Sequence, residues 1–210
     1  MTEIDAALLS EDLVDPDPFR QFGVWFAEAV EAGLPQPEAM ALATATPDAR
    51  PSVRMVLLKA FDERGFVFYS NAESRKGREL AANPHAALAI HWEGLHRQVR
   101  ACGDITPVAP EESDVYFASR PRGAQLAAVA SAQSRPIGTR DELIAEYRRL
   151  DEALAGRDVP RPAHWGGFRL RPDEIEFWHG RTDRLHDRLR YSRPPGDPAT
   201  GGWSVERLAP

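Results

Sequence analysis

Short strand patterns separated by tight turns are the feature that most limits how this chain can fold. Apolar and polar residues alternate over short runs, and Gly, Pro, Asn or Asp fill the few residues between them. Such spacing is typical of antiparallel hairpins, because parallel strands need a crossover of a dozen or more residues. The predicted strands cover 39–46, 51–61, 66–71, 85–92, 97–108, 168–172, 174–180, 184–192 and 202–208. We therefore expect an α+β fold with a mainly antiparallel, closed barrel.

Helical patterns flank this strand-rich part of the chain. The expected helices cover 18–32, 74–83, 109–120, 123–133 and 139–154. Ser74 is predicted to cap the second, and Thr139 with Glu142 has the spacing of a capping box. Strict strand–helix alternation and Gly-rich nucleotide motifs are both missing, which argues against a doubly wound nucleotide fold. Residues 1–18 are expected to be a flexible acidic arm, and 19–210 a single domain.

Charge and cysteine content exclude several classes of protein. The 210 residues carry 32 acidic and 26 basic side chains, a net charge of −6, whereas a generic nucleic-acid binder has a basic excess. No run approaches the roughly 18 apolar residues of a membrane span, and the acidic start lacks a signal-peptide pattern. The single cysteine, Cys102, is expected to be buried and favours a reducing, cytoplasmic compartment. The histidines lack metal-ligand spacing, so no metal is expected.

The two lysines, Lys59 and Lys76, stand out among the 26 basic residues, because the rest are arginines. Compositional bias explains most of the arginine. It does not explain why two lysines remain, and a lysine supplies a compact ammonium with three rotatable donors. We interpret both as candidate phosphate ligands.

Three clusters of basic residues are candidates for anion binding. Arg54 and Lys59 stand near the two ends of one apolar strand pattern. Arg75 and Lys76 begin a helix, where free backbone N–H groups also attract anions. Tyr116 and Arg120 are four residues apart and would share a helix face. Each pattern also fits solvated strand or helix ends, and spacing alone does not decide between the two interpretations.

A fourth cluster lies near the C-terminus. If 184–192 is a strand, Arg184, His186 and Arg188 point to one side. Three such side chains on one face are tolerable beside an anionic or aromatic ligand, or in solvent at a sheet edge. Trp178, just before them, could cover an aromatic ring.

These motifs, taken in order, resemble the pyridoxamine 5′-phosphate oxidases. The resemblance runs from Phe19 to Pro210 through RMVLLK, FYSNAESRKGREL, RQVR, YFASRPRGAQ, ASAQSRP, WGGFRL, EFWHG, RLHDR and ERLAP. It implies a split β-barrel, FMN at a homodimer interface, and no nucleic-acid or membrane partner. The implied reaction is oxidation of pyridoxamine or pyridoxine 5′-phosphate to pyridoxal 5′-phosphate, with O₂ as acceptor and H₂O₂ as product.

The resemblance also implies site residues, matched motif by motif. The FMN positions are Arg54, Met55, Val56, Leu57, Leu58, Lys59, Tyr69, Ser70, Arg75, Lys76, Gln98, Gln133, Ser134, Trp178 and Arg188. The positions that bind the small phosphorylated pyridine are Lys59, Tyr116, Arg120, Arg184 and His186, the last two being also the catalytic pair. Gln133, Ser134, Trp178 and Arg188 are expected to complete a site begun by Arg54 and Lys76 of the other chain.

The chain departs from the family pattern at three places. Ala124 stands where the family often has Ser, Gln36 replaces a frequent acidic residue, and the N-terminal arm is acidic where some members are basic. Two alternatives therefore stay open. One is a related split-barrel oxidase acting on another substrate, such as a phenazine precursor. The other is a flavin- or pyridoxal-phosphate-binding protein without turnover.

Overall fold

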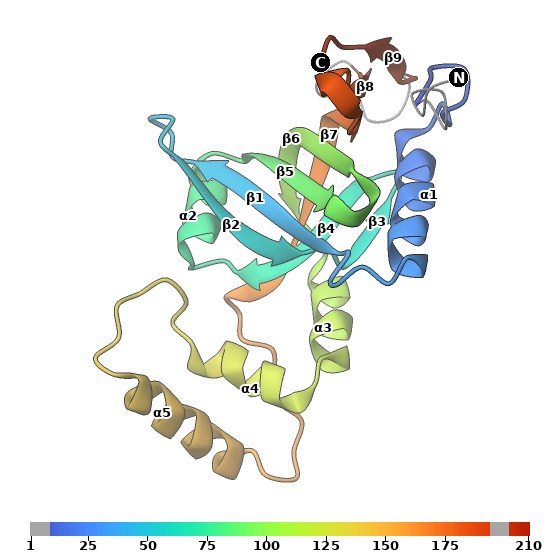
Figure 1. The fold of residues 1–210 in the computed structure, drawn as a ribbon. Coiled ribbons are helices and arrows are strands. Elements are labelled where there is room, and N and C mark those ends of the chain that lie inside the picture. The colour runs from blue at the N-terminus through green and yellow to red at the C-terminus, as the bar shows by residue number, and fades with distance from the viewer. Residues whose placement is uncertain (1–8, 194–201) are drawn as a thin grey trace.

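A curled antiparallel sheet with flanking helices forms the protein (Figure 1), as the sequence predicts. The structure is a computed structural model that describes residues 9–193 and 202–210. The strands are β1 Ala39–Ala45, β2 Pro51–Leu57, β3 Ala60–Asp62, β4 Gly65–Asn71, β5 His85–Trp92, β6 Arg97–Pro107, β7 Trp165–His179, β8 Asp187–Ser192 and β9 Ser204–Arg207. The helices are α1 Pro18–Glu31, α2 Arg75–Ala82, α3 Pro110–Ser119, α4 Arg122–Ala130 and α5 Arg140–Ala153, with 3₁₀ turns η2 Glu93–Leu95 and η3 Thr182–Arg184.

The strand order explains why the sheet curls. It runs β2-β1-β5-β6-β7-β4-β3, with β8 beside β7 and β9 beside β8. The predicted strand 51–61 is therefore two strands at opposite ends of this order. Only Leu58 and Lys59 separate them: the Leu58 N–H bonds the Glu38 carbonyl, and the Lys59 N–H bonds the Val67 carbonyl. Two residues cannot span a flat sheet, so the sheet folds round until its ends meet.

The predicted strands 168–172 and 174–180 form one long strand, β7, because it has partners along its whole length. Its first half pairs with β4 and its second half with β8, while β6 lies along the other side. A register shift at Cys102/Gly103 accommodates the change. Cys102 itself points outward and is exposed, contrary to the expectation of burial. Its neighbour Ala101 takes the inward position, as the period of two requires.

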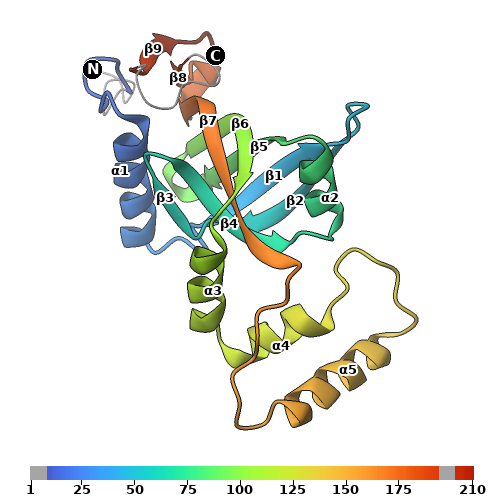
Figure 2. The same cartoon turned by 180° about the vertical axis from the view of Figure 1, so that it is seen from behind.

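Helix α1 closes one side of the barrel and supplies much of the core. Asp17 caps it by accepting a hydrogen bond from the Phe19 N–H. The fully buried Phe22 ring meets Phe61 and Phe66 edge-on, at centroid distances of 4.7 and 5.0 Å. Helices α3, α4 and α5 lie at the end of the sheet opposite the two termini (Figure 2). None of the described helices is long and apolar enough to cross a membrane.

The described part of the acidic arm, residues 9–17, contacts the C-terminal strands. Arg207 donates to the Leu9 carbonyl and pairs with Glu11. The Tyr191 hydroxyl donates to the Asp15 carbonyl at 2.8 Å. This segment is thus hydrogen-bonded to β8 and β9 instead of standing free. Residues 1–8 of the predicted arm, and 194–201 of the predicted last loop, lie outside the described residues.

Gly65 provides a test of this fold. Its φ of +133° suits glycine, and a Cβ there would lie 1.9 Å from the Leu170 carbonyl oxygen. We expect Gly65→Ala to lower the free energy of unfolding by about 3 kcal/mol, measured by chemical denaturation. Gly33→Ala is the control, because φ is +67° there but no atom lies within 4 Å. It should cost about 1 kcal/mol, and equal losses would contradict the close packing at Gly65.

Candidate functional site

A cavity of about 1270 Å³ opens where β2, the β4–α2 turn and helices α3 to α5 meet. It exceeds the roughly 300–1,000 Å³ usual for one small ligand, so it has room for a cofactor beside a substrate. Many of the site residues predicted from the sequence line this cavity: Arg54, Met55, Val56, Leu57, Lys59, Tyr69, Ser70, Arg75, Lys76, Tyr116, Arg120, Gln133 and Ser134. The structure therefore brings most of the predicted positions to one place.

Lys76 lies at the start of α2 and is only 8% exposed. Ser74 caps this helix by accepting from the Gly77 N–H, as predicted. The Lys76 ammonium donates to Ser70 at 3.0 Å, to Ser74 at 3.3 Å and to the Gln133 side-chain oxygen at 2.9 Å. Burial, and then the nearby Arg54 charge, lower the pKa of Lys76 to about 8. A bound anion would favour the charged form.

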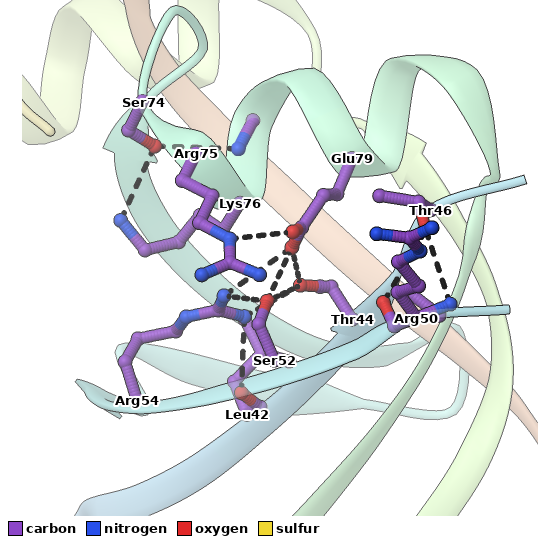
Figure 3. A network of polar contacts seen from close by, with 12 residues as sticks. Leu42, Thr44, Thr46, Arg50, Ser52, Arg54, Ser74, Arg75, Lys76 and Glu79 are labelled. Carbon is purple, nitrogen blue, oxygen red and sulfur yellow. Dashed lines mark hydrogen bonds and ion pairs between the residues drawn. The ribbon is translucent and has the colours of Figure 1, made fainter. Parts of the chain in front are cut away.

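A buried carboxylate, Glu79, links the two arginines of the site (Figure 3). It accepts from Arg54 at 3.3 Å and from the Arg75 Nε at 2.8 Å, and also from the hydroxyls of Thr44 and Ser52. Burial alone would raise the pKa of Glu79, but these hydrogen bonds outweigh it and lower the pKa to about 2. The carboxylate is therefore ionised at neutral pH.

Glu79, Thr44 and Ser52 are not among the residues that the sequence motifs predict for the site. Only the four-residue spacing of Arg75 and Glu79 could have indicated the first of them. Thr44 and Ser52 meet across the β1–β2 pair, a register that nothing in either segment specifies.

An aromatic stack forms another wall of the cavity. The Tyr69 ring lies 4.0 Å from Tyr116 and 5.3 Å from Trp165, nearly parallel to both. The Arg120 guanidinium sits 4.8 Å from the Trp165 centroid. Burial lowers the pKa of Arg120. Its Nη1 is buried without a hydrogen-bond partner in the described part of the chain, as suits a donor for an anionic ligand.

Arg120 reaches this position differently from the prediction. It lies just beyond α3, with extended φ and ψ of −73° and 147°. The shared helix face expected for Tyr116 and Arg120 is therefore wrong, and the aromatic stack places the guanidinium instead.

Gln133 and Ser134 also differ from their predicted setting. Helix α4 ends at Ala130, so Gln133 is not in the helix predicted over 123–133, and Ser134, beyond that helix, has a φ of +69°. Gln133 contacts Lys76 of its own chain. The expectation that these two residues act in the other chain's site is wrong for Gln133, and Ser134 lines the same cavity. The loop after α4 folds back over α2, which sequence spacing does not reveal.

Six predicted positions lie outside their own chain's cavity. One of them, Leu58, points into the core and is 5% exposed. The other five lie on β6, β7, η3, β8 and the turn between η3 and β8: Gln98, Trp178, Arg184, His186 and Arg188. In the sheet, Trp178 stands between Gln98 and Arg188. Arg188 pairs with the buried Glu176 at 2.9 Å.

The predicted strand over 184–186 is wrong. Asp183 and Arg184 have positive φ values of 56° and 61°, and β8 begins only at Asp187. Two contacts hold this turn: the Arg181 N–H donates to His186 Nδ1 at 3.0 Å, and the Arg181 side chain pairs with Asp187. Arg184 and His186 therefore do not share one face of a strand, contrary to the prediction, because neither lies in one. The His186 ring instead lies against Trp178, with centroids 4.7 Å apart.

Comparison with known proteins identifies the family. Residues 26–152 match the family model described as pyridoxamine 5′-phosphate oxidase. The chain belongs to the pyridoxamine 5′-phosphate oxidase family, which is one of oxidoreductases. Residues 165–210 match its C-terminal dimerisation region, which indicates a homodimer. This region includes β7, β8 and β9, with Trp178, Arg184, His186 and Arg188.

Named relatives are similar in sequence to this chain over nearly their full length. Proteins named pyridoxine/pyridoxamine 5′-phosphate oxidase from Rubrobacter xylanophilus and Paraburkholderia phymatum are 57% and 55% identical, covering 99% and 94% of this chain and 94% and 91% of their own. The crystal structure of PhzG from Burkholderia lata, in complex with tetrahydrophenazine-1-carboxylic acid, has a TM-score of 0.90 and 34% identity over all of both chains. A related FMN-binding protein from Nostoc punctiforme has a TM-score of 0.71 at 17% identity, covers 89% of this chain and 96% of its own, and supports the fold alone.

The pKa of Lys76 leads to a testable pH dependence. A bound anion favours the charged form of Lys76. Above pH 8 the amine of the free protein is mostly neutral, so Lys76 must take up a proton when the anion binds. For FMN, the cofactor that the sequence motifs predict, we expect the affinity to be level below pH 8 and to fall by up to about tenfold per pH unit above it. Fluorescence titrations between pH 6.5 and 9.5 would measure this. Lys76→Met should bind more weakly, without that slope. The same slope in both proteins would assign the titration to another group.

Proposed function

We propose that this protein is an FMN-dependent oxidase that converts pyridoxamine and pyridoxine 5′-phosphates to pyridoxal 5′-phosphate, with O₂ as acceptor and H₂O₂ as product. The single observation that carries the proposal is a cavity with two groups of cationic side chains on different elements. Arg54, Arg75 and Lys76 form one group, on β2 and α2, and we assign Lys59 and Arg120, which line the same cavity from other parts of the chain, to the second. Two groups suit one phosphate on the cofactor and one on the substrate. The single cysteine is consistent with a cytoplasmic enzyme.

The first group fits the monophosphate of FMN. The buried Lys76 and the paired guanidiniums of Arg54 and Arg75 would bind the phosphate. Ser70, Gln133 and Ser134 would add polar contacts beside it, and residues 55–57 of β2 would lie along the ring system. When bound, the flavin would supply hydride acceptance from the substrate carbon that bears the amine or alcohol.

The second group fits the substrate phosphate. Arg120 has an unpartnered buried Nη1, and Tyr116 and Lys59 line the same cavity. The burial of Arg120 strengthens its attraction for an anion, because little water screens the charge. Ala124, where the family often has serine, lines the cavity without a hydroxyl. The three remaining donors would hold the phosphate and orient the pyridine ring.

We assign the remaining predicted residues to the partner's cavity in the homodimer. Gln98, Trp178 and Arg188 adjoin one another on β6, β7 and β8, and Arg184 and His186 follow in the same C-terminal region. His186 accepts the Arg181 N–H at Nδ1, so the neutral ring carries its proton on Nε2. His186 would thus donate to the substrate and would not act as its general base.

A second candidate substrate is a phenazine precursor. The PhzG structure is similar to this chain over all of both chains and contains tetrahydrophenazine-1-carboxylic acid. Retention of Lys59, Tyr116 and Arg120 in the cavity supports the phosphorylated substrate instead. The higher identity to the named pyridoxine/pyridoxamine 5′-phosphate oxidases supports it too.

The visible spectrum of the purified protein tests the proposal. Flavin bands should be present, and they should bleach on anaerobic addition of pyridoxamine 5′-phosphate. Admission of O₂ should restore them with release of H₂O₂. If a reduced phenazine carboxylate bleached the flavin bands and pyridoxamine 5′-phosphate did not, the second candidate substrate would be favoured. Bound flavin that neither compound bleaches would indicate a flavin-binding protein without turnover. Mass analysis of the released flavin should give FMN, and FAD as the only species would contradict the proposal.

Replacement of Arg184 tests the assignment of the C-terminal residues. Arg184→Leu removes the guanidinium but keeps much of the stem. We expect kcat/KM to fall by about 2–4 kcal/mol of transition-state stabilisation, with FMN content unchanged. His186→Asn should cost less, because it removes one contact and leaves the guanidinium. Lys76→Ala should lower flavin occupancy first. Loss of flavin in Arg184→Leu, with full activity in the remaining holoprotein, would place Arg184 in the cofactor site instead.

A mixed dimer tests whether the two chains share each site. If Lys76 and Arg184 serve one site from opposite chains, a dimer of one Lys76→Ala chain and one Arg184→Leu chain has one intact site and one doubly altered site. Differently tagged chains, co-expressed and purified through both tags, should be more active than either parent dimer. Activity no higher than the parents' would argue that each site is built within one chain.

A further inference from the structure

The carboxylate of Glu79 has no free capacity for acid–base chemistry. It is 5% exposed and accepts hydrogen bonds from four side chains on three elements: Thr44 of β1, Ser52 and Arg54 of β2, and Arg75 of α2. A saturated, buried carboxylate does not exchange protons readily near neutral pH. Its effect must come through the groups it holds.

Two of those groups are cations that line the cavity. One carboxylate oxygen accepts from Arg54 and the other from Arg75, so Glu79 sets the separation of two guanidiniums on different elements (Figure 3). Arg54 is held further by the Thr44 hydroxyl at 2.6 Å and the Leu42 carbonyl at 3.2 Å. Arg75 is 60% exposed at its side chain and, among the contacts of the described residues, has only Glu79 as an ionic partner. Its direction therefore depends on that carboxylate.

Charge balance gives Glu79 a second effect. Arg54, Arg75 and Lys76 repel one another, and the Arg54 charge already acts on Lys76. With Glu79 ionised, the four side chains carry a net charge of +2, which matches a phosphate monoester dianion. Without it, the three cations would face one another, and no other carboxylate of residues 9–193 or 202–210 forms an ion pair with any of them.

We propose that Glu79 is a positioning residue of the phosphate site, whose buried carboxylate aligns Arg54 and Arg75 with Lys76 to bind a phosphate monoester. The inference rests on the proposed function in that the monoester is taken to be that of FMN. The positioning role and a simple count of charges predict opposite changes in anion affinity when Glu79 is neutralised. Removal of a negative charge should by itself strengthen anion binding, whereas loss of alignment should weaken it.

Glu79→Gln separates these two effects. The amide keeps the size of the side chain, but its NH₂ group would face donors on Arg54, Ser52 or Thr44. Full-length protein freed of flavin would be titrated with FMN and with riboflavin, which lacks the phosphate. We expect the Kd for FMN to rise about tenfold, as befits the loss of charge-assisted hydrogen bonds, and the Kd for riboflavin to change less than twofold.

Glu73→Gln is the matched control. Glu73 lies just before α2, is 63% exposed at its side chain and pairs with Arg135 at 3.7 Å, apart from the three cations. The same chemical change there should leave both affinities as in the wild type. A general effect of lost negative charge would appear in both variants, whereas an effect of alignment would appear only in Glu79→Gln.

The outcomes are distinct. Unchanged or tighter FMN binding by Glu79→Gln would overturn the positioning role, and so would equal weakening for FMN and riboflavin, which would indicate a structural role. If Glu79→Gln does not fold by circular dichroism, Ser52→Ala removes one hydrogen bond to Glu79 and one from Arg54. It should weaken FMN binding about threefold and spare riboflavin, and no selective loss would overturn the proposal. Wild-type protein that binds neither flavin would refute the proposed function itself.

Discussion

The closure of the sheet between Leu58 and Lys59 is the constraint on which the rest of the structure depends. Strands β2 and β3 are consecutive in the chain but stand at opposite ends of the sheet order, so two residues join the two edges. The backbone bonds of Leu58 to Glu38 and of Lys59 to Val67 hold this junction on both sides. Closure buries Leu58 in the core and leaves Lys59 at the rim of the cavity. It also brings the arginine of β2 beside the end of β4 and the start of α2.

The site that results is built from charges that would be costly to bury singly. Lys76 is nearly inaccessible to solvent, and the cost of burying it is seen in its lowered pKa. The hydrogen bonds that the Lys76 ammonium donates to Ser70, Ser74 and Gln133, together with the Glu79 carboxylate that holds the two arginines, make the cluster tolerable. A bound phosphate would complete the balance, because it supplies the negative charge that this arrangement lacks. The same electrostatic terms that strain the free protein therefore favour the liganded one.

Strand β7 connects the two halves of the proposed enzyme. Its first half pairs with β4, next to the cavity, and its second half carries Trp178 and pairs with β8. The second half is stabilised by buried acids that each hold two arginines: Glu176 pairs with Arg100 and Arg188, and Asp187 with Arg181 and Arg207. One continuous strand therefore fixes the cavity relative to the C-terminal residues of the same chain. This continuity suits the proposed site, in which two aromatic rings would have to be aligned.

The sequence by itself determined the class of fold, the helix caps and the cationic residues of the cavity. Alternation, turn residues and capping residues act over a few positions, so they identify hairpins and the start of α2 at Ser74 without any knowledge of distant contacts. The contrast of two lysines with many arginines likewise marked Lys59 and Lys76, both of which line the cavity. Tertiary structure alone decided the break after Leu57, the turn at Asp183 and Arg184, and the contact of Gln133 with Lys76. It also decided the role of Glu79, whose partners Thr44 and Ser52 lie 35 and 27 residues away in the chain. Such contacts depend on sheet closure and register, which are set by the packing of the whole barrel and not by any local pattern.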